Sequence, residues 1–268
     1  MRNKSLFIVL SALLLVAGSA YASHSWGKYH WNISTEESLI NPLVLGDALT
    51  TLDWQVSLGI AAADWNKSVL KNAVTTTTNT NCNPVLGTVQ VCNAAYGEND
   101  WLGIAQIWAY RGKDSHIAQA LTKMNDTYFA MPEYDSQAWR DFVMCQEVGH
   151  TLGLDHQDEN FENANLGTCM DYTGDPDGAL LGQLDNRRPN AHDYEMLSSI
   201  YDHVNNPSTK PGNGKGKPAN RGTNIDIDLN DSAAWGMAVR HYARGNASLY
   251  ERDLGNGIVL LTHVFWAL

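Results

Sequence analysis

The chain has 268 residues, of which 18 are basic and 29 acidic, so its formal net charge is −11 at pH 7. An acidic chain without a basic stripe is a poor candidate for binding nucleic acid or an anionic membrane surface. We therefore expect neither partner, and we interpret the acidity as a contribution to solubility.

Residues 1–22 have the pattern of a secretory signal peptide. Arg2 and Lys4 precede an apolar run over 6–17, and the chain then reads A-Y-A up to Ala22. The run is shorter than the roughly 20 residues that a membrane-spanning helix needs, so a cleaved signal is favoured over an anchor. The sequence predicts a secreted protein, extracellular or periplasmic, with a mature net charge of −13 from 16 basic and 29 acidic residues.

Residues 23–204 combine strand-like and helix-like patterns. Apolar side chains recur at a helical period in 49–68, whereas the β-branched run 72–78 is typical of a strand. Ser136 or Asp135 can cap a helix that ends at Gly153. Because strands come first and helices later, the fold class is α+β. The sequence predicts strands at 29–34, 72–78, 103–110 and 116–124, and helices at 49–68, 136–153 and 189–203.

The composition changes after this main block. Residues 205–222 are rich in Pro, Gly, Asn and Lys, which is typical of a flexible linker. Residues 223–268 form a β-rich tail, in which Gly255-Asn256-Gly257 between two strand-like runs predicts a hairpin. The tail has few residues for an independent domain, so docking on the main block stays open.

The four cysteines suggest disulfides in an exported protein. Cys82 and Cys92 flank a turn-rich loop, which favours a local bridge and leaves Cys145 to pair with Cys169. The alternative is a metal-ligating Cys145. It precedes His150 by five residues, about 140° around a helix, so the two do not easily face one ion.

One stretch, CQEVGHTLGLDHQDE, has the spacing of a metal site. Gln146 and His150 are one helical turn apart, and Glu147 is one step around the helix. Gly153 lets the chain bend back, so that His156 can return to the same ion. Three protein ligands, an open position for water and one carboxylate are what a catalytic zinc centre needs.

A second stretch, GTCMDYT at 167–173, strengthens this interpretation. It resembles the methionine turn of metzincin-clan zinc metallopeptidases of the matrixin and astacin type. The stretch from Gln146 to His156 resembles their H-E-x-x-H-x-x-G-x-x-H signature, with Gln for the first His. The resemblance implies a metzincin-like twisted mixed β-sheet with an active-site helix, a methionine turn and a C-terminal helix. It places Met170 beneath the ligands and gives Tyr172 a stabilising role at the metal or the oxyanion.

The resemblance also implies a function, a secreted zinc-dependent endopeptidase. Zn²⁺ would be held by Gln146, His150 and His156, and Glu147 would act as general base toward a metal-bound water. A protein or peptide substrate would add as another strand along an edge strand at Gly103–Tyr110.

Supporting residues follow from the same resemblance. A bridge between Cys145 and Cys169 would join the metal helix to the methionine turn, beside Gly153 and Met170. The clan usually carries an inhibitory pro-segment, and few residues lie between Ala22 and the first expected strand. Latency is then absent, supplied by the tail, or unnecessary at a weak site.

Gln146 leaves alternatives open, because an amide oxygen is a weaker zinc donor than imidazole. Gln146 ligates directly, holds a ligating water, or leaves the site without metal, and Asp158 is a substitute ligand. The alternative function is a catalytically weak or inactive metal-binding or protein-binding module. An acidic cluster could bind Ca²⁺, although it lacks EF-hand spacing and a solvated loop is preferred; it comprises Asp155, Asp158, Glu159 and Glu162.

Overall fold

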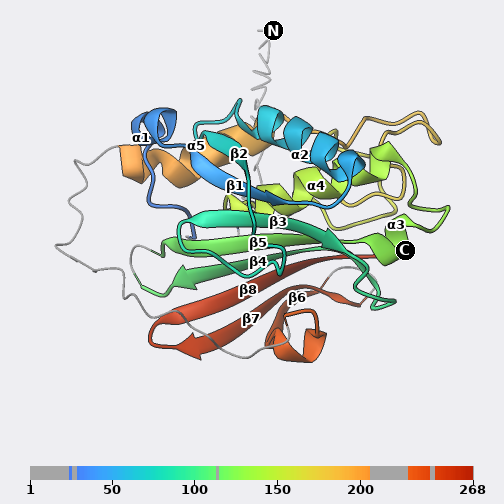
Figure 1. Ribbon diagram of the computed structural model, residues 1–268. Helices are drawn as coiled ribbons and strands as arrows, with labels where there is room; N and C mark the ends of the chain where they lie inside the picture. Colours follow the sequence, from blue (N-terminus) through green and yellow to red (C-terminus); the bar gives the residue numbers. More distant parts are fainter. Residues whose placement is uncertain (1–23, 26–28, 113–114, 206–228, 242–244, 268) are drawn as a thin grey trace, which may run out of the picture.

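The computed structural model describes residues 24–25, 29–112, 115–205, 229–241 and 245–267. Within these ranges the chain is α+β, with one eight-stranded mixed sheet in the order β2-β1-β3-β5-β4-β8-β7-β6 (Figure 1). The helices are α1 (Thr35–Ile40), α2 (Leu52–Trp65), α3 (Asp126–Phe129), α4 (Gln137–Thr151), α5 (Ala191–Asn205) and the short 3-10 helix η1 (Ser232–Ala234). The strands are β1 (Leu43–Ala48), β2 (Asn72–Thr76), β3 (Thr88–Ala94), β4 (Trp101–Tyr110), β5 (Ile117–Asn125), β6 (Met237–His241), β7 (Ala247–Gly255) and β8 (Ile258–Trp266).

The two halves of the sheet differ in strand direction. The pairs β1–β2, β1–β3 and β3–β5 are parallel. From β4 onward every described pair is antiparallel. Helix α4 packs across β4 and β5, and α2 packs on α4, so these helices cover the sheet on one side (Figure 1).

Helix α4 is well specified by its ends and its packing. The Ser136 side chain accepts a hydrogen bond from the backbone N–H of Trp139, as the capping pattern predicts. At the other end Gly153 has φ +106°, a conformation that favours glycine. The indole N–H of Trp65 in α2 donates to the carbonyl of Cys145 at 3.0 Å. The helix is therefore fixed between α2 and the sheet.

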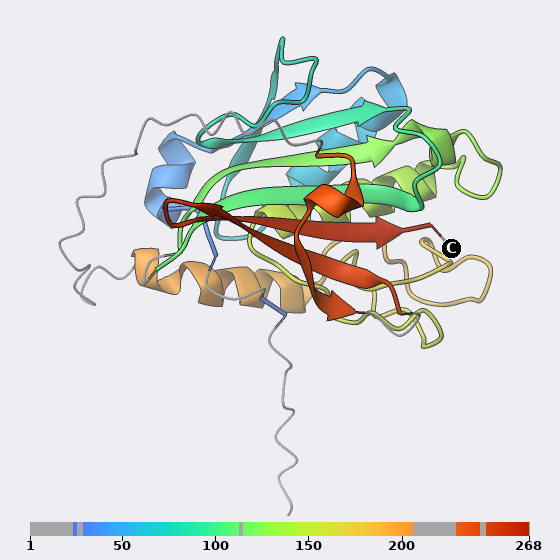
Figure 2. The same cartoon turned by 90° about the horizontal axis from the view of Figure 1, so that it is seen from below.

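The predicted hairpin in the tail is confirmed as β7–β8. Its turn residues Asn256 and Gly257 both have positive φ, as a two-residue hairpin turn requires. The tail extends the same sheet, because β8 pairs with β4 from Trp101–Trp266 to Tyr110–Ile258. Figure 2 shows β8 lying beside the much earlier strand β4. A strand from the end of the chain thus completes the middle of the sheet.

Most predicted elements are confirmed with shifted ends. Helices 49–68, 136–153 and 189–203 correspond to α2, α4 and α5, and strands 72–78, 103–110 and 116–124 correspond to β2, β4 and β5. The predicted strand 29–34 is wrong. This segment makes an isolated bridge at His30 and then leads into α1, whose first turn is capped by Ser34.

Strands β1 and β3 were missed, since polar residues interrupt their apolar runs. Asp47 lies in β1, and Gln90 and Asn93 are buried in β3. The buried amides are paired, with Asn93 Nδ2 donating to Asp126 at 2.6 Å. Satisfied polar groups of this kind are tolerated in a buried strand, although they obscure its pattern.

A third correction concerns the expected edge strand at Gly103–Tyr110. Strand β4 is an inner strand here, because β5 and β8 pair with its two sides. The predicted signal peptide 1–22 and linker residues 206–222 lie outside the described residues. None of the described helices has the length and apolar character needed to cross a membrane.

Candidate metal centre

Helix α4 and the turn after it bring two predicted ligands together. His150 lies in the last turn of α4, and Gly153 reverses the chain so that His156 returns toward the helix. A Cβ on Gly153 would lie 2.7 Å from the carbonyl oxygen of Tyr29, so the turn has no room for a side chain. The Nε2 atoms of His150 and His156 are 3.0 Å apart, and both rings are buried.

The other nitrogen of each ring contacts an oxygen acceptor. His150 Nδ1 lies 2.9 Å from the carbonyl oxygen of Leu154, and His156 Nδ1 lies 2.9 Å from a Glu159 carboxylate oxygen. These oxygens only accept, so each Nδ1 carries a hydrogen, and Nε2 is the nitrogen that each ring can offer to a metal ion. Two Nε2 lone pairs that faced each other would repel unless a cation lay between them. Two nitrogens on a tetrahedral zinc are separated by about 3.3 Å, close to the observed distance.

Glu147 and Gln146 supply buried oxygen atoms on the same helix. Neither carboxylate oxygen of Glu147 has a hydrogen-bond partner in the described part of the chain, and burial raises its pKa well above the usual value. The Gln146 amide donates to the carbonyl of Cys169 at 2.8 Å, which directs its nitrogen there. Its oxygen is buried and lacks a partner among the described residues. Buried oxygen atoms that accept no hydrogen bond are suited to a site that holds a cation.

Strand β4 approaches the Glu147 carboxylate closely. A Cβ built on Gly103 would lie 2.7 Å from Oε1 of Glu147 and 2.6 Å from a methyl carbon of Val143. A side chain at Gly103 would therefore force the side chains of Val143 and Glu147 to move. The carboxylate therefore lies against the backbone of β4.

The methionine-turn residues pack beneath α4. A Cβ on Gly149 would lie 2.7 Å from the Met170 sulfur, so this sulfur is in close contact with the helix. The Tyr172 ring centroid is 4.4 Å from that of His156, and its hydroxyl donates to the carbonyl of Val264 in β8 at 3.1 Å. The turn therefore contacts α4 through Met170 and His156 through Tyr172.

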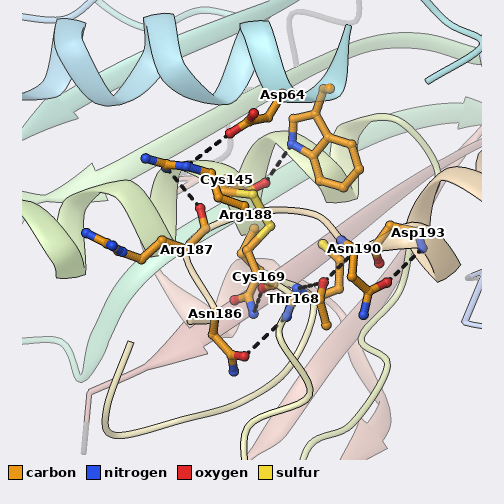
Figure 3. Close-up of a disulfide and its surroundings, with 12 residues drawn as sticks. Asp64, Cys145, Thr168, Cys169, Asn186, Arg187, Arg188, Asn190 and Asp193 are labelled. Atoms are coloured by element: carbon orange, nitrogen blue, oxygen red, sulfur yellow. Dashed lines mark hydrogen bonds and ion pairs between the residues drawn. A yellow bond between two sulfur atoms is a disulfide. The ribbon is translucent and has the colours of Figure 1, made fainter. Parts of the chain in front are cut away.

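Both predicted disulfides, Cys82–Cys92 and Cys145–Cys169, are present. The second joins α4 to the methionine turn (Figure 3). Arg188 lies beside it and pairs with Asp64 of α2 at 3.1 Å. The turn and α4 are thus joined covalently, and Arg188 also pairs with Asp141 of α4 at 3.3 Å.

Two residues of the tail, His263 and Arg240, lie at the centre, although neither belongs to the motifs that predicted it. His263 of β8 is fully buried and stacks on His150, with ring centroids 4.1 Å apart and planes inclined by 15°. Arg240 of β6 contacts the Asp155 carboxylate. One signal was available for His263, which alternates with Val259, Leu261 and Phe265 and therefore shares their face of the strand.

Two acidic residues, Asp155 and Glu159, lie beside His156. Ligand atoms of Asp155, His156 and Glu159 lie within 4.8 Å of one another, which makes them a possible cation group. Arg240 already contacts Asp155, and Glu159 accepts from His156.

Asp158 is directed into its own loop. Its carboxylate accepts from the backbone N–H of Asn160 and the amide of Asn163. These bonds hold it in the loop, so nothing here favours Asp158 as a substitute for Gln146. Glu162 is an exposed residue of the same loop.

No protein-family model matches the chain, and no curated protein matches it in sequence.

Proposed function

We propose that the chain is a secreted zinc-dependent endopeptidase with His150 and His156 as ligands and Glu147 as general base. The observation that carries this proposal is the pair of Nε2 atoms facing each other at 3.0 Å while both Nδ1 atoms contact oxygen acceptors. An ordinary buried histidine pair places a donor opposite an acceptor. Here both rings direct Nε2 to one point while Nδ1 is held by an oxygen acceptor, which is the arrangement of two ligands around one cation.

Gln146 is the third ligand in this proposal. Its amide nitrogen is directed to the carbonyl of Cys169, and its oxygen has no partner among the described residues. An amide oxygen is a harder and weaker donor than imidazole. We therefore expect weaker zinc binding than at a three-histidine centre, partly offset by the disulfide that holds α4 to the turn.

The proposed catalytic side chains have separate tasks. A zinc ion held by His150, His156 and Gln146 would polarise the substrate carbonyl and lower the pKa of water. Glu147 accepts a proton from the attacking water and then donates it to the nitrogen that leaves as the amine when the C–N bond breaks. Burial disfavours the Glu147 carboxylate, whereas a nearby cation favours it. The Tyr172 hydroxyl donates a hydrogen bond to the carbonyl oxygen of the substrate as negative charge develops there.

Other features of the molecule agree with this assignment. The long helix α2, the site helix α4, the methionine turn and the closing helix α5 follow in the order that the metzincin resemblance implies. The two disulfides suit an oxidising compartment, as export requires.

The second candidate is a metal-binding or protein-binding module with little or no catalysis. It is favoured by the Gln146 amide, which is committed to a structural hydrogen bond, and by β8, which covers β4. Under this alternative the chain binds zinc, and substituting Glu147 changes no activity.

The test combines metal content with peptide hydrolysis. We expect about one zinc per chain, lost in His150→Ala and His156→Ala and retained in Glu147→Gln. His241→Ala, which removes an exposed histidine of β6, is the matched control and should retain zinc. Zinc-dependent hydrolysis that disappears in Glu147→Gln supports the peptidase. A zinc-free wild-type chain refolded in excess zinc would refute the peptidase and the metal-binding form of the second candidate.

A further inference from the structure

Strand β8 lies where an added substrate strand would lie. It runs antiparallel to β4 and pairs with it from Trp101–Trp266 to Tyr110–Ile258. The seam between the two strands passes the candidate metal centre. The backbone groups of β4 that would bind an extended peptide are therefore already paired with the chain's own tail.

The Val264–Phe265 peptide bond lies beside side chains of the candidate site. The Tyr172 hydroxyl donates to the Val264 carbonyl oxygen at 3.1 Å. Phe265 is opposite Gly103, the residue whose backbone lies against the Glu147 carboxylate. The proposed oxyanion donor thus contacts this peptide bond, and the proposed base lies against the β4 residue that is paired with Phe265.

The ladder on the other side of β8 ends just before this bond. Among the described residues, β7 pairs with β8 only as far as the Leu249–His263 position. The Val264 carbonyl oxygen therefore accepts from Tyr172 rather than from β7. A carbonyl presented in this way resembles that of a bound substrate.

The side chains of His263 and Phe265 in β8 lie beside residues of the candidate site. Phe265 is fully buried, with its ring centroid 5.1 Å from Tyr172, 5.4 Å from Phe142 and 6.2 Å from Phe161. His263 stacks on His150. In an ordinary core strand the face shared by Val259, Leu261 and Phe265 favours another apolar residue. A histidine there is explained by its place beside the metal ligands.

We propose that β8 is an intramolecular occupant of the substrate groove, which keeps the full chain latent and presents its Val264–Phe265 bond to the site. The inference rests on the proposed function for the identity of the groove. It implies that substrates are extended peptides with an aromatic side chain directly after the cleaved bond. Activity then requires β8 to leave β4. Neither disulfide includes a residue of β8, so no cross-link opposes its departure.

The test loosens β8 and measures occupancy separately from catalysis. Phe265→Ala removes the aromatic anchor, and Leu45→Ala, a fully buried residue of β1, is the control for general core loss. The probe is a fluorescent peptide of sequence LLTHVFWAL, which copies residues 260–268. Removing a buried Phe side chain is a large loss of packing, so we expect the probe to bind Phe265→Ala at least about 10-fold more tightly than wild type or Leu45→Ala.

Hydrolysis is the second measurement. The zinc-loaded chain should cleave peptide substrates at least about 10-fold faster when it carries Phe265→Ala. The probe should be cleaved between its Val and Phe. Both activities should disappear when Glu147→Gln is added. If Phe265→Ala does not fold, Phe265→Leu provides the same test with a smaller rise.

The outcomes separate the two proposals. Equal probe binding by folded Phe265→Ala, Leu45→Ala and wild type would overturn the occupancy of the groove, and the peptidase would stand if Glu147-dependent hydrolysis persists. Tight probe binding by Phe265→Ala without Glu147-dependent hydrolysis would support the occupancy and refute the peptidase.

Discussion

The two walls of the candidate site are fastened in different ways. One wall, α4 with the methionine turn, is cross-linked by Cys145–Cys169 and carries all the proposed catalytic residues. The other wall, β8, is held by a backbone ladder and by packing, and it contributes His263 and Phe265. A site that must open for a substrate needs one wall of each kind. The difference suggests that chemistry belongs to the fixed wall and regulation to the removable one.

The largest expected effect is the loss of hydrolysis when the proposed base of the fixed wall is replaced. Glu147→Gln in the Phe265→Ala chain should lower hydrolysis by roughly 10²–10⁴-fold, the usual contribution of a positioned proton acceptor. Zinc content should stay unchanged, because Glu147 is not a ligand in this account. Kinetic assays and metal analysis of the same samples measure both. Retained hydrolysis would remove Glu147 from the mechanism.

The second prediction concerns the cross-link. Replacing Cys145 and Cys169 by Ser should lower the free energy of unfolding by about 3 kcal/mol and weaken zinc binding, because the Gln146 partner carbonyl belongs to Cys169. The Cys82 and Cys92 pair replaced by Ser is the control, with a comparable loss of stability and unchanged zinc affinity. Denaturant unfolding and metal titration provide the data. Equal zinc affinities in the two variants would contradict a role for the bridge in the site.

The third prediction uses Asp171, a buried acid of the fixed wall. Burial raises its pKa from 3.8 to about 6, despite hydrogen bonds from Leu166 and Asn186. The folded-state pKa is above the unfolded one, so this stabilisation is complete below pH 3.8 and is lost as the pH rises through about 6. From pH 3.5 to 7 Asp171 should cost up to about 3 kcal/mol. Asp171→Asn should flatten that part of the pH–stability curve, and an unchanged curve would refute the assignment.

The smallest expected effect concerns an ion pair between the end of β4 and β7, the strand that pairs with β8. Arg111, which follows β4, pairs with Glu251 of β7 at 2.5 Å and is partly exposed. Arg111→Ala should cost no more than about 1 kcal/mol, as exposed ion pairs do. Latency should persist, since the Phe265 anchor is untouched. Probe binding as tight as in Phe265→Ala would move the latch from the aromatic pocket to this ion pair.

The fixed wall could be predicted from the sequence, and the removable wall could not. His150 and His156 lie within one short stretch, so helical geometry and one glycine turn bring them together, and Gln146 and Glu147 lie on the same helix. The disulfide pairing also followed from local spacing. His263 and Arg240 reach the site through strand pairing across more than 80 residues, and no local pattern encodes that register. The edge prediction for β4 failed for the same reason.

The most direct test of the central claim is an anomalous diffraction map of full-length protein crystallised with zinc. The account predicts one peak about 2 Å from Nε2 of both His150 and His156, with Gln146 Oε1 as the nearest further protein donor and β8 still paired with β4. A histidine pair without a peak would contradict it. So would a peak held by Asp155 and Glu159 instead, because the facing nitrogens would then have another cause.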